Sequence, residues 1–382
     1  MSRRVKTETE FTKVRHLTSR KNGRMPIQSP ISRRTAFKCL LAALAAMAGS
    51  SSLAWPLRRS SSLSPLWQLA DLANAGMPPA SSTTASPTWQ KPAIPRSNFH
   101  AVYDDPQARD RFYLFLQNIY HLYPESQFHQ LIIDLTSEFS SDQEIYVNLQ
   151  KRLSSIKPFL SEATYGLPAL RKQKAEMANE TAALLGSTKA CSGYVEIGTT
   201  GRYANGIRAK IPIEGPMYFV NDLEPSYSPN DIVERGQLTK LGKYVAMGNY
   251  EPFNGNPIPD ESVDLVTNFI GFHHAPADKR ARFIQSVWQV LRPGGRLVVR
   301  DHVVDSPEMD AFVALAHDVF NAGLNIPWQD NAAQIRNFTS VPQLEEALGA
   351  VGFEKTNSRQ LQAHDPTINT LVVFMKPAVR AG

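Results

Sequence analysis

Cysteine is scarce in this sequence, since the 382 residues contain only Cys39 and Cys191. If the apolar run that holds Cys39 is cleaved off, one cysteine remains and no internal disulfide can form. The chain also lacks a cysteine cluster and a His-x-x-x-His spacing, so we expect no metal site. No Gly-x-Ser-x-Gly elbow is present, which argues against a serine hydrolase.

Long hydrophobic runs are also missing. The run CLLAALAAMAG at 39–49 holds about 11 residues, whereas a bilayer-spanning helix needs about 20. The preceding SRRTAFK resembles the twin-arginine export motif, with Phe37 displaced by one position and with matches at Ser32, Arg33, Arg34 and Lys38. Together with the small residues SLA at 52–54, these features predict a signal segment over 1–54 that the twin-arginine export machinery recognises. The alternative is a basic tail followed by a short amphipathic helix.

Positive charge is concentrated at the N-terminus. Residues 1–38 contain eleven Lys or Arg and two Glu, a charge of +9, whereas the whole chain carries +6. The remainder therefore carries −3, so its composition predicts no nucleic-acid partner. Residues 55–98 are rich in Ser, Pro, Thr and Ala and bury too little apolar surface to fold, so we predict a disordered linker there.

Helical periodicity begins near Asp104. Apolar residues recur at spacings of three and four in the first helix, at Phe112, Phe115, Ile119 and Leu122. Asp105 and Pro106 suit its N-cap and first turn, and Gly186 suits the C-cap of the last helix. We predict four helices, at 106–122, 124–139, 141–159 and 167–186, which form a helical cap domain over 99–188.

Strands and helices alternate from about residue 191. The predicted strands lie at 193–198, 216–222, 243–249, 262–270, 295–304, 353–361 and 369–377, and the predicted helices at 277–293, 306–323 and 340–352. Short apolar strands that alternate with helices predict an α/β fold with a mostly parallel sheet covered on both faces. Ligands of such sheets bind at the carboxyl ends of the strands.

The first strand ends in EIGTTG, in which Gly198 and Gly201 permit a tight turn and a close ligand. The turn is not a full Gly-x-Gly-x-x-Gly motif, because Thr200 and Tyr203 replace its second and third glycines. Asp222 follows about 20 residues later at the end of the second strand. Its carboxylate is placed to accept both hydroxyls of a ribose, although an aspartate there is also a common solvated turn residue.

Three motifs at their spacings resemble a class I S-adenosylmethionine-dependent methyltransferase of the type 11 group. They are VEIGTTG at 195–201, IPDESVDLVTNFIGFHH at 258–274 and LRPGGRLVVRDH at 291–302. The resemblance covers 191–377 and implies a methyltransferase domain over 189–382. It also implies a Rossmann-like seven-stranded sheet with an antiparallel last strand, S-adenosyl-L-methionine as cofactor, and methyl transfer to a small-molecule or lipid-like acceptor.

The resemblance also implies cofactor-binding roles. Glu196 would orient the turn and the cofactor's amino group, the turn would admit the methionine part, and Asp222 would hold the ribose. Asn249 would lie by the adenine, where an acid is common in the family. The implied cofactor-binding residues are Glu196, Gly198, Thr199, Gly201, Asp222, Asn249, Asn268 and Phe269. Thr200 and Arg202 depart from the family, in which many members have glycine at these two positions.

Three histidines follow strand ends and are the candidate catalytic bases: His273, His274 and His302. The alternatives are that His302 is a turn residue paired with Asp301, and that the His273–His274 pair is structural. The helical block is predicted to cap the pocket. Its aromatic residues Phe115, Tyr120 and Tyr123 either line an apolar cleft or belong to the core, and 317–331, with Trp328, is a second candidate lid.

Two other functions stay open on sequence grounds. One is an exported binding protein that keeps the fold without catalysis, because a cofactor made in the cytoplasm is hard to supply outside it. The other is a nicotinamide oxidoreductase, which shares the glycine turn. The signal segment predicts an exported or periplasmic location, and retention in the cytoplasm is the alternative.

Overall fold

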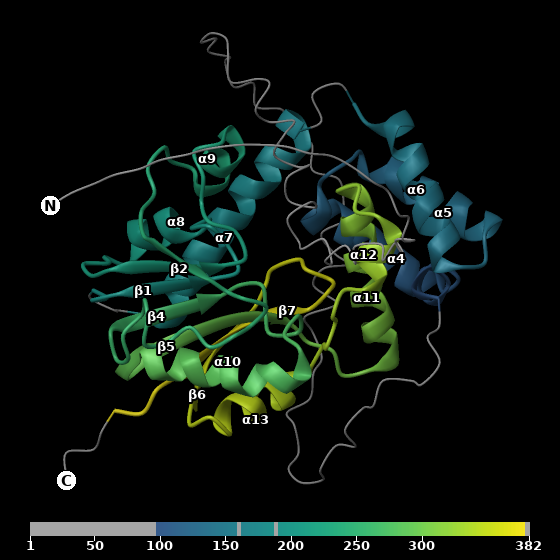
Figure 1. Cartoon of the computed structure of the whole chain (residues 1–382). Helices are drawn as coiled ribbons and strands as arrows, with labels where there is room; N and C mark the ends of the chain where they lie inside the picture. Colours follow the sequence, from purple (N-terminus) through teal and green to yellow (C-terminus); the bar gives the residue numbers. More distant parts are fainter. Residues whose placement is uncertain (1–96, 159–161, 187–189, 379–382) are drawn as a thin grey trace, which may run out of the picture. The chain divides into compact units, whose positions relative to one another are not determined.

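The computed structural model describes residues 97–158, 162–186 and 190–378 (Figure 1). The predicted signal segment and the linker up to residue 96 lie outside the described residues. No helix among the described residues has the length and apolar character needed to cross a membrane.

Seven strands form one sheet in the order β3-β2-β1-β4-β5-β7-β6. Strands β1 to β5 run parallel, and β7 runs antiparallel to both of its neighbours, β5 and β6. This arrangement confirms the predicted fold class. The strands are β1 Tyr194–Ile197, β2 Met217–Asn221, β3 Lys243–Ala246, β4 Val263–Asn268, β5 Leu291–His302, β6 Glu354–Leu361 and β7 Asn369–Met375.

Helices cover both faces of the sheet, as Figure 1 shows. Because successive strand residues point to opposite faces, Tyr194 packs on one side of β1 and Val195 on the other. The helices α7 (Leu167–Leu185) and α8 (Ala204–Lys210) share the core of Tyr194, and α10 (Ala277–Val290) and α13 (Val341–Gly349) share that of Val195. The central strands therefore have both faces buried, which explains their apolar sequences.

The boundary between α10 and β5 differs from the prediction. The sequence predicted a helix to residue 293, but α10 ends at Val290 and β5 begins at Leu291. Leu291 pairs with Val263 at the start of β4, and Pro293 has no N–H to continue the helical hydrogen bonds. The segment LRPGG is therefore the irregular start of a strand.

The N-terminal helices, α3 to α6, comprise α3 Asn98–Tyr103, α4 Pro106–Phe115, the π-helical turn η2 Leu116–Tyr120, α5 Glu125–Glu138 and α6 Asp142–Ile156. As predicted, Asp105 caps α4, and its carboxylate accepts hydrogen bonds from two backbone N–H groups. The predicted helix to residue 122 is wrong at its end. His121 has a left-handed backbone (φ 41°), which ends the helix before Leu122.

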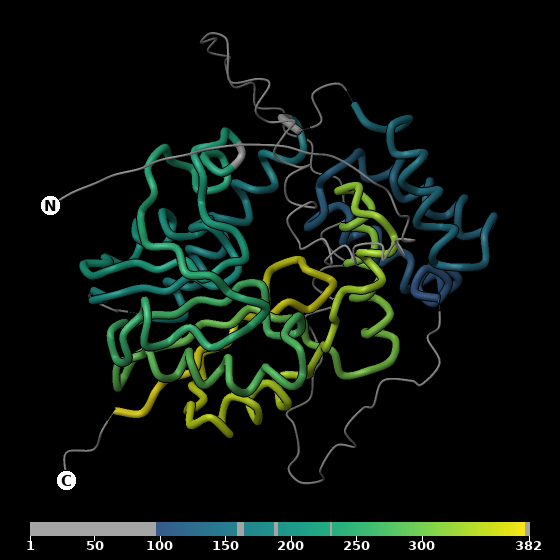
Figure 2. Tube along the Cα trace, in the orientation of Figure 1, coloured from purple at the N-terminus to yellow at the C-terminus, as the bar shows by residue number. Residues whose placement is uncertain are grey.

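The N-terminal helices pack against α11 (Pro307–Gly323) and α12 (Trp328–Ala332) in one hydrophobic core (Figures 1 and 2). Tyrosine hydroxyls fix the contact, since Tyr120 donates to the carbonyl of Val319 and Tyr123 to that of Gly323. Phe115, Tyr120 and Tyr123 are buried, so they are core residues rather than the lining of an open cleft. Helix α7 packs instead on the sheet, so the predicted 99–188 cap divides between two cores.

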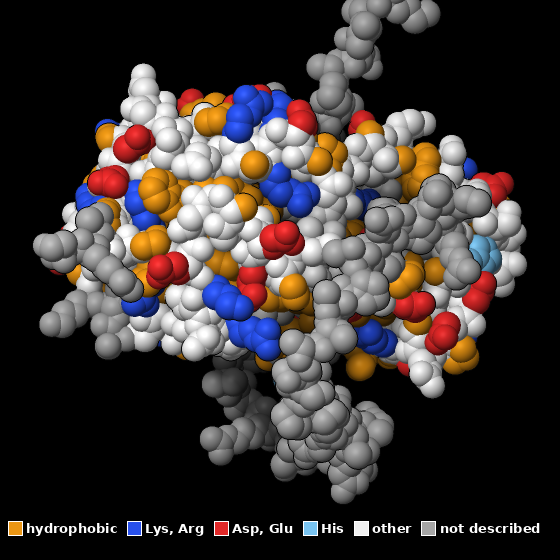
Figure 3. Space-filling view, turned by 90° about the horizontal axis from the view of Figure 1, so that it is seen from below, with side chains coloured by type: hydrophobic (Ala, Val, Ile, Leu, Met, Phe, Trp, Pro, Cys, Tyr) orange, Lys and Arg blue, Asp and Glu red, His pale blue; other side chains and the backbone are white. Residues whose placement is uncertain are grey.

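The face of the molecule shown in Figure 3 mixes basic, acidic and apolar side chains. Two further helical segments complete the described chain: the π-helical turn η3 Glu162–Gly166 and α9 Pro229–Arg235. Helix α9 lies after β2 in the chain, and its Glu234 and Arg235 are buried. The Glu234 carboxylate pairs with Arg202, the residue that follows the glycine turn of β1, whereas the Arg235 guanidinium donates to the carbonyl of Ser226.

Candidate functional site

The glycine turn lies at the carboxyl end of β1, which pairs with both β2 and β4 at the centre of the sheet. Gly198 and Gly201 have positive φ angles of 86° and 96°, as the predicted turn requires. A Cβ on Gly198 would clash with the side chain of Ile270, and one on Gly201 would lie 2.9 Å from Phe219. Both positions therefore exclude side chains by space as well as by backbone conformation.

The side chain of Glu196 holds the glycine turn in place through hydrogen bonds. Its buried carboxylate accepts hydrogen bonds from the hydroxyl of Thr199 and, at 3.2 Å, from the backbone N–H of Tyr203. The other carboxylate oxygen accepts a bond of 3.0 Å from the Tyr194 hydroxyl. Burial raises the pKa of Glu196, although these hydrogen bonds oppose the shift. Glu196 thus orients the turn, and its predicted contact with the cofactor's amino group stays a prediction.

Asp222 and Asn249 follow the ends of β2 and β3. Asp222 comes directly after the last residue of β2, and the Tyr244 hydroxyl donates to its backbone carbonyl. Asn249 is exposed in the turn after β3 with φ 57°, and its carbonyl accepts a bond from Lys279. Both residues therefore lie at the sheet edge that the sequence predicted, and their roles in cofactor binding stay predictions.

Asn268 ends β4 directly opposite Ile197 of β1. Its side-chain N–H donates to the carbonyl of Gly271, while its Oδ1 is buried and lacks a hydrogen-bond partner among the described residues. The Thr200 hydroxyl in the glycine turn is likewise buried without a partner in the described structure. Phe269 is buried edge-on against Tyr203, with the ring centroids 4.8 Å apart. Unpaired polar atoms thus flank the predicted methionine-binding turn.

Arg202 was noted in the sequence only as a departure from glycine. In the structure its guanidinium forms an ion pair with Glu234 of α9. Burial lowers the pKa of Arg202, but the charge of Glu234 outweighs burial and holds that pKa above its usual value. This ion pair joins the end of the glycine turn to α9. Sequence spacing gave no signal for a contact between residues 32 positions apart.

The three candidate bases converge in one cluster. The ring centroids of His273 and His302 lie 5.4 Å apart, and those of His273 and His274 lie 4.1 Å apart. The Nδ1 of His273 lies 2.5 Å from the carboxylate of Asp301, which also accepts the backbone N–H groups of Phe272 and His302. Asp301 therefore orients the ring of His273.

The pKa values of His302 and Asp301 are both lowered, but for different reasons. Burial lowers the pKa of His302 to about 4, and His273 and Arg300 add to the shift. Burial disfavours the Asp301 carboxylate, but its contacts with His273 and His302 outweigh burial and lower its pKa. A general base works best when its pKa lies near the working pH. The lowered pKa makes His302 a weaker base than an ordinary histidine, and its catalytic role stays a prediction.

The structure adds one histidine that the sequence analysis did not single out as a site residue. His317 on α11 has its ring centroid 5.3 Å from that of His273 and 5.3 Å from that of His274. It belongs to the predicted lid 317–331, whose Trp328 packs edge-on against Tyr146 in the core of the N-terminal helices. This segment is therefore packed against those helices, and its role as a lid stays a prediction.

One family model matches the chain. Residues 233–299 match the model described as "Methyltransferase domain". The matched segment contains β3, β4 and α10, most of β5, and the pair His273–His274, whereas the glycine turn lies before it. The chain therefore contains a segment of methyltransferase type. Among curated proteins no match was found.

Three solved structures are examples of what the chain is similar to. Human N-acetylserotonin methyltransferase in complex with SAM is 11% identical, with 74% of this chain and 70% of that chain covered and a TM-score of 0.37. The CurJ carbon methyltransferase is 17% identical, with 71% and 69% covered and a TM-score of 0.39. A putative methyltransferase of Haloferax volcanii, in complex with its Trm112 activator, is 16% identical, with 55% and 93% covered and a TM-score of 0.39.

Proposed function

We propose that this chain is an S-adenosylmethionine-dependent methyltransferase that acts on a small-molecule or lipid-like acceptor. The observation that carries the proposal is the glycine turn directly after β1, the strand that pairs with β4 of the segment of methyltransferase type. In open α/β sheets, ligands bind at this switch point of the strand order. The acceptor class follows from the sequence resemblance.

The residues at this edge suit the cofactor. The buried Oδ1 of Asn268 and the buried hydroxyl of Thr200 have no partner among the described residues, so a bound ligand would satisfy them. In this proposal the carboxylate of Asp222, which comes directly after β2, accepts the ribose hydroxyls. Glu196 is already bonded to Thr199, Tyr203 and Tyr194, so its part is to hold the turn.

When bound, S-adenosylmethionine supplies a methyl group on a positively charged sulfur, which is already an activated electrophile. The chain then has to align the acceptor with that methyl group and exclude water. Such alignment alone is worth about 7–11 kcal/mol of a reaction barrier in well-oriented systems. In this proposal Phe269, buried directly after β4, lies near the methyl donor.

Calorimetry on the full chain tests the proposal. We expect S-adenosylmethionine to bind in the micromolar range, roughly −7 to −8 kcal/mol, and NAD not to bind. Transfer of a labelled methyl group to a component of a cell extract would separate an enzyme from a binding protein with the same fold. Tight NAD binding, or no binding of S-adenosylmethionine, would overturn the proposal.

Asp222→Ala probes the placement of the cofactor. We expect the variant to lose about 1.5–3 kcal/mol of S-adenosylmethionine affinity, the usual scale for hydrogen bonds to a charged group. The matched control is Asp260→Ala, which removes an exposed carboxylate at the opposite end of β4 and should leave affinity unchanged. Equal affinity in wild type and Asp222→Ala would show that Asp222 is a turn residue.

A further inference from the structure

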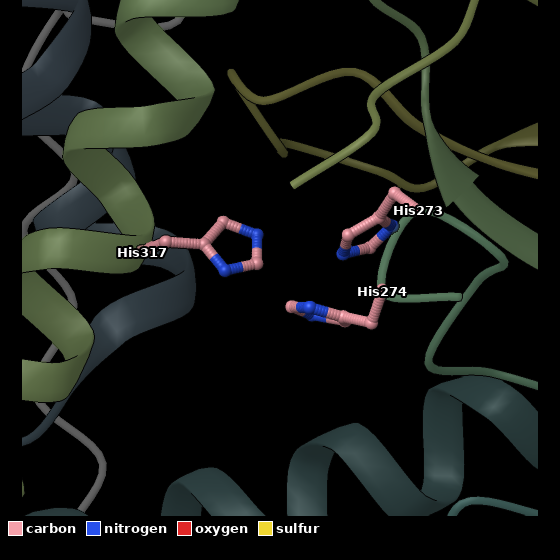
Figure 4. A group of neighbouring side chains, drawn as sticks. All are labelled: His273, His274 and His317. Carbon is pink, nitrogen blue, oxygen red and sulfur yellow. The ribbon is translucent and has the colours of Figure 1, made fainter. Parts of the chain in front are cut away.

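Three histidine side chains face one another between two elements of the fold (Figure 4). His273 and His274 come from the histidine loop, residues 269–276 after β4, and His317 comes from α11. One potential ligand nitrogen from each ring lies within 4.8 Å of the other two. Because His274 and His317 are 43 positions apart in the chain, sequence spacing alone did not show this group.

In two of the three rings, a hydrogen bond at Nδ1 leaves Nε2 as the nitrogen that can bind a metal. The Nδ1 of His273 faces the Asp301 carboxylate, and the Nδ1 of His274 lies 2.9 Å from the carbonyl of Ile335. Both partners only accept hydrogen bonds, so in the neutral rings the proton is on Nδ1 and the lone pair on Nε2. The Nε2 of His273 is buried and has no partner among the described residues.

A segment of three residues, Ile335–Asn337, holds the loop and α11 together. The N–H of Asn337 donates to the carbonyl of His273, and its side chain donates to that of Ala275. Arg336 donates to the carbonyl of Ala314 on α11 and pairs with Asp318 at 2.8 Å. The three rings are therefore carried by elements that are fixed to one another, as a preorganised site requires.

We propose that His273, His274 and His317 bind a divalent transition metal of the zinc class. Three imidazoles suit zinc or cobalt, whereas magnesium and calcium prefer oxygen ligands. The Asp301–His273 pair matches the carboxylate–histidine–metal arrangement that orients a ligand ring. This site replaces the sequence-based expectation of no metal, which considered only local spacing.

The present spacing is slightly wide for a bound ion. With metal–nitrogen bonds of about 2.0–2.1 Å, tetrahedral geometry places ligand nitrogens about 3.3 Å apart. The widest pair here is within 4.8 Å, so the rings have to close by about 1.5 Å at most. His274 and His317 are only half-buried, so a shift of their side chains disturbs less of the core than a shift of the buried His273.

Three protein ligands leave a fourth position open, which is typical of catalytic rather than structural zinc sites. That position suits an anionic oxygen or a water molecule. A bound metal would lower the pKa of such a water. The histidine loop begins at Phe269, directly after Asn268, so the proposed metal and cofactor sites share one short segment. The metal proposal stands independently of the proposed methyl transfer.

Metal titration of the full chain tests the site. After treatment with a chelator, the chain is titrated with Zn²⁺ against a chromophoric chelator, and with Co²⁺, whose visible absorption reports coordination geometry. We expect one tight equivalent that His317→Ala and His274→Ala each weaken by about 100-fold or more. Asp301→Asn should weaken it by about 10–100-fold, the usual effect of losing the partner of a ligand ring.

The matched control is His364→Ala, which removes an exposed histidine and should leave the titration unchanged. Circular dichroism verifies that each variant is folded, and the half-buried positions of His274 and His317 favour this. If both variants keep the wild-type affinity and stoichiometry, the metal binds elsewhere and the proposal is overturned. A chain that binds zinc but no S-adenosylmethionine would keep the metal site and overturn the proposed function.

Discussion

At the scale of single residues, Gly198 and Gly255 offer a controlled comparison, because both have φ 86°. A Cβ on Gly255 has no atom within 4 Å, whereas one on Gly198 meets Ile270. We expect Gly255→Ala to cost about 1 kcal/mol from backbone strain alone. Gly198→Ala should cost at least about 1–2 kcal/mol more and weaken cofactor binding, since the clash adds to the strain.

Urea denaturation of the two variants measures this difference. Truncating the neighbouring side chain in Gly198→Ala/Ile270→Ala should recover part of the extra loss relative to Ile270→Ala alone. Equal destabilisation by Gly198→Ala and Gly255→Ala would mean that Ile270 moves aside without cost. In that case the turn is less tightly packed than the structure indicates.

We predict that Glu180 on α7 makes the stability of the folded chain depend on pH. Burial, with the nearby Glu176 adding, raises its pKa from 4.5 to about 7. Between these values the folded carboxyl holds a proton that the unfolded chain has lost, so stability falls as pH rises through about 5–7. Glu180→Gln removes this term, and we expect it to gain about 2 kcal/mol over wild type at pH 8 and little at pH 4.

Thermal or urea unfolding at a series of pH values checks the Glu180 prediction. Glu354→Gln on the exposed surface of β6 is the control and should follow the wild-type pH profile. A constant difference between Glu180→Gln and wild type from pH 4 to pH 8 would show that the buried carboxyl does not titrate in this range.

The sequence predicted the residues of the candidate site that depend on local geometry. Gly198 and Gly201 have the positive φ angles expected of the turn, and Asp222 directly follows β2. The sequence did not reveal the Arg202–Glu234 ion pair or the position of His317, because these contacts join elements that are distant in the chain. Pairing of this kind is set by tertiary packing rather than by spacing.

At the scale of elements, α11 follows β5 in the chain and packs against the N-terminal helices. Phe312 on α11 is buried and packs edge-on against Phe112 of α4, with centroids 5.3 Å apart. We expect Phe312→Ala to destabilise the chain by about 3–5 kcal/mol, as for large core truncations. Phe320 on the same helix is 37% exposed, so Phe320→Ala should cost about 1 kcal/mol or less.

Chemical denaturation followed by two probes shows whether the N-terminal helices and the sheet unfold together. Far-ultraviolet circular dichroism reports helices, and tryptophan fluorescence includes Trp288 on α10 and Trp328 on α12. One shared transition that shifts in Phe312→Ala supports a common core. Two separate transitions, with only one shifted, would show that the N-terminal helices unfold independently of the sheet.

The sequence predicted long elements better than their ends. Each predicted strand overlaps a strand of the structure, because apolar runs between turn residues are a strong signal. The short helices α3, α8, α9 and α12 were not predicted, since five to seven residues give too little periodicity. The π-helical turn η2 was missed because it continues the apolar stripe of α4.

At the scale of the whole molecule, the sequence predicted the seven-stranded sheet but not the division of the helices. An apolar stripe shows that a helix face is buried, but it does not show which surface covers it. Met177 and Leu185 of α7 join the core on one face of the sheet, whereas α3 to α6 join α11 and α12. The predicted export signal concerns residues 1–54, outside the described structure, and stays a prediction.

This division predicts how shortened chains behave. A chain that begins at Ala190 lacks α3 to α7 and uncovers two apolar surfaces, one on α11 and one around Ile207 and Phe219. A chain that begins at Leu167 keeps α7 and uncovers only the surface on α11. We therefore expect the first chain to aggregate strongly and the second less, because large exposed apolar patches drive association.

Light scattering coupled to size exclusion, with calorimetry for S-adenosylmethionine, measures both effects. A chain that begins at Ser97 keeps every described helix and strand and serves as the control, with the cofactor affinity of the full chain. If the chain from Ala190 is monodisperse and methylates the same acceptor at the same rate, the N-terminal helices are an independent module. The acceptor site would then lie within residues 305–340, where α11 carries His317 toward the histidine loop.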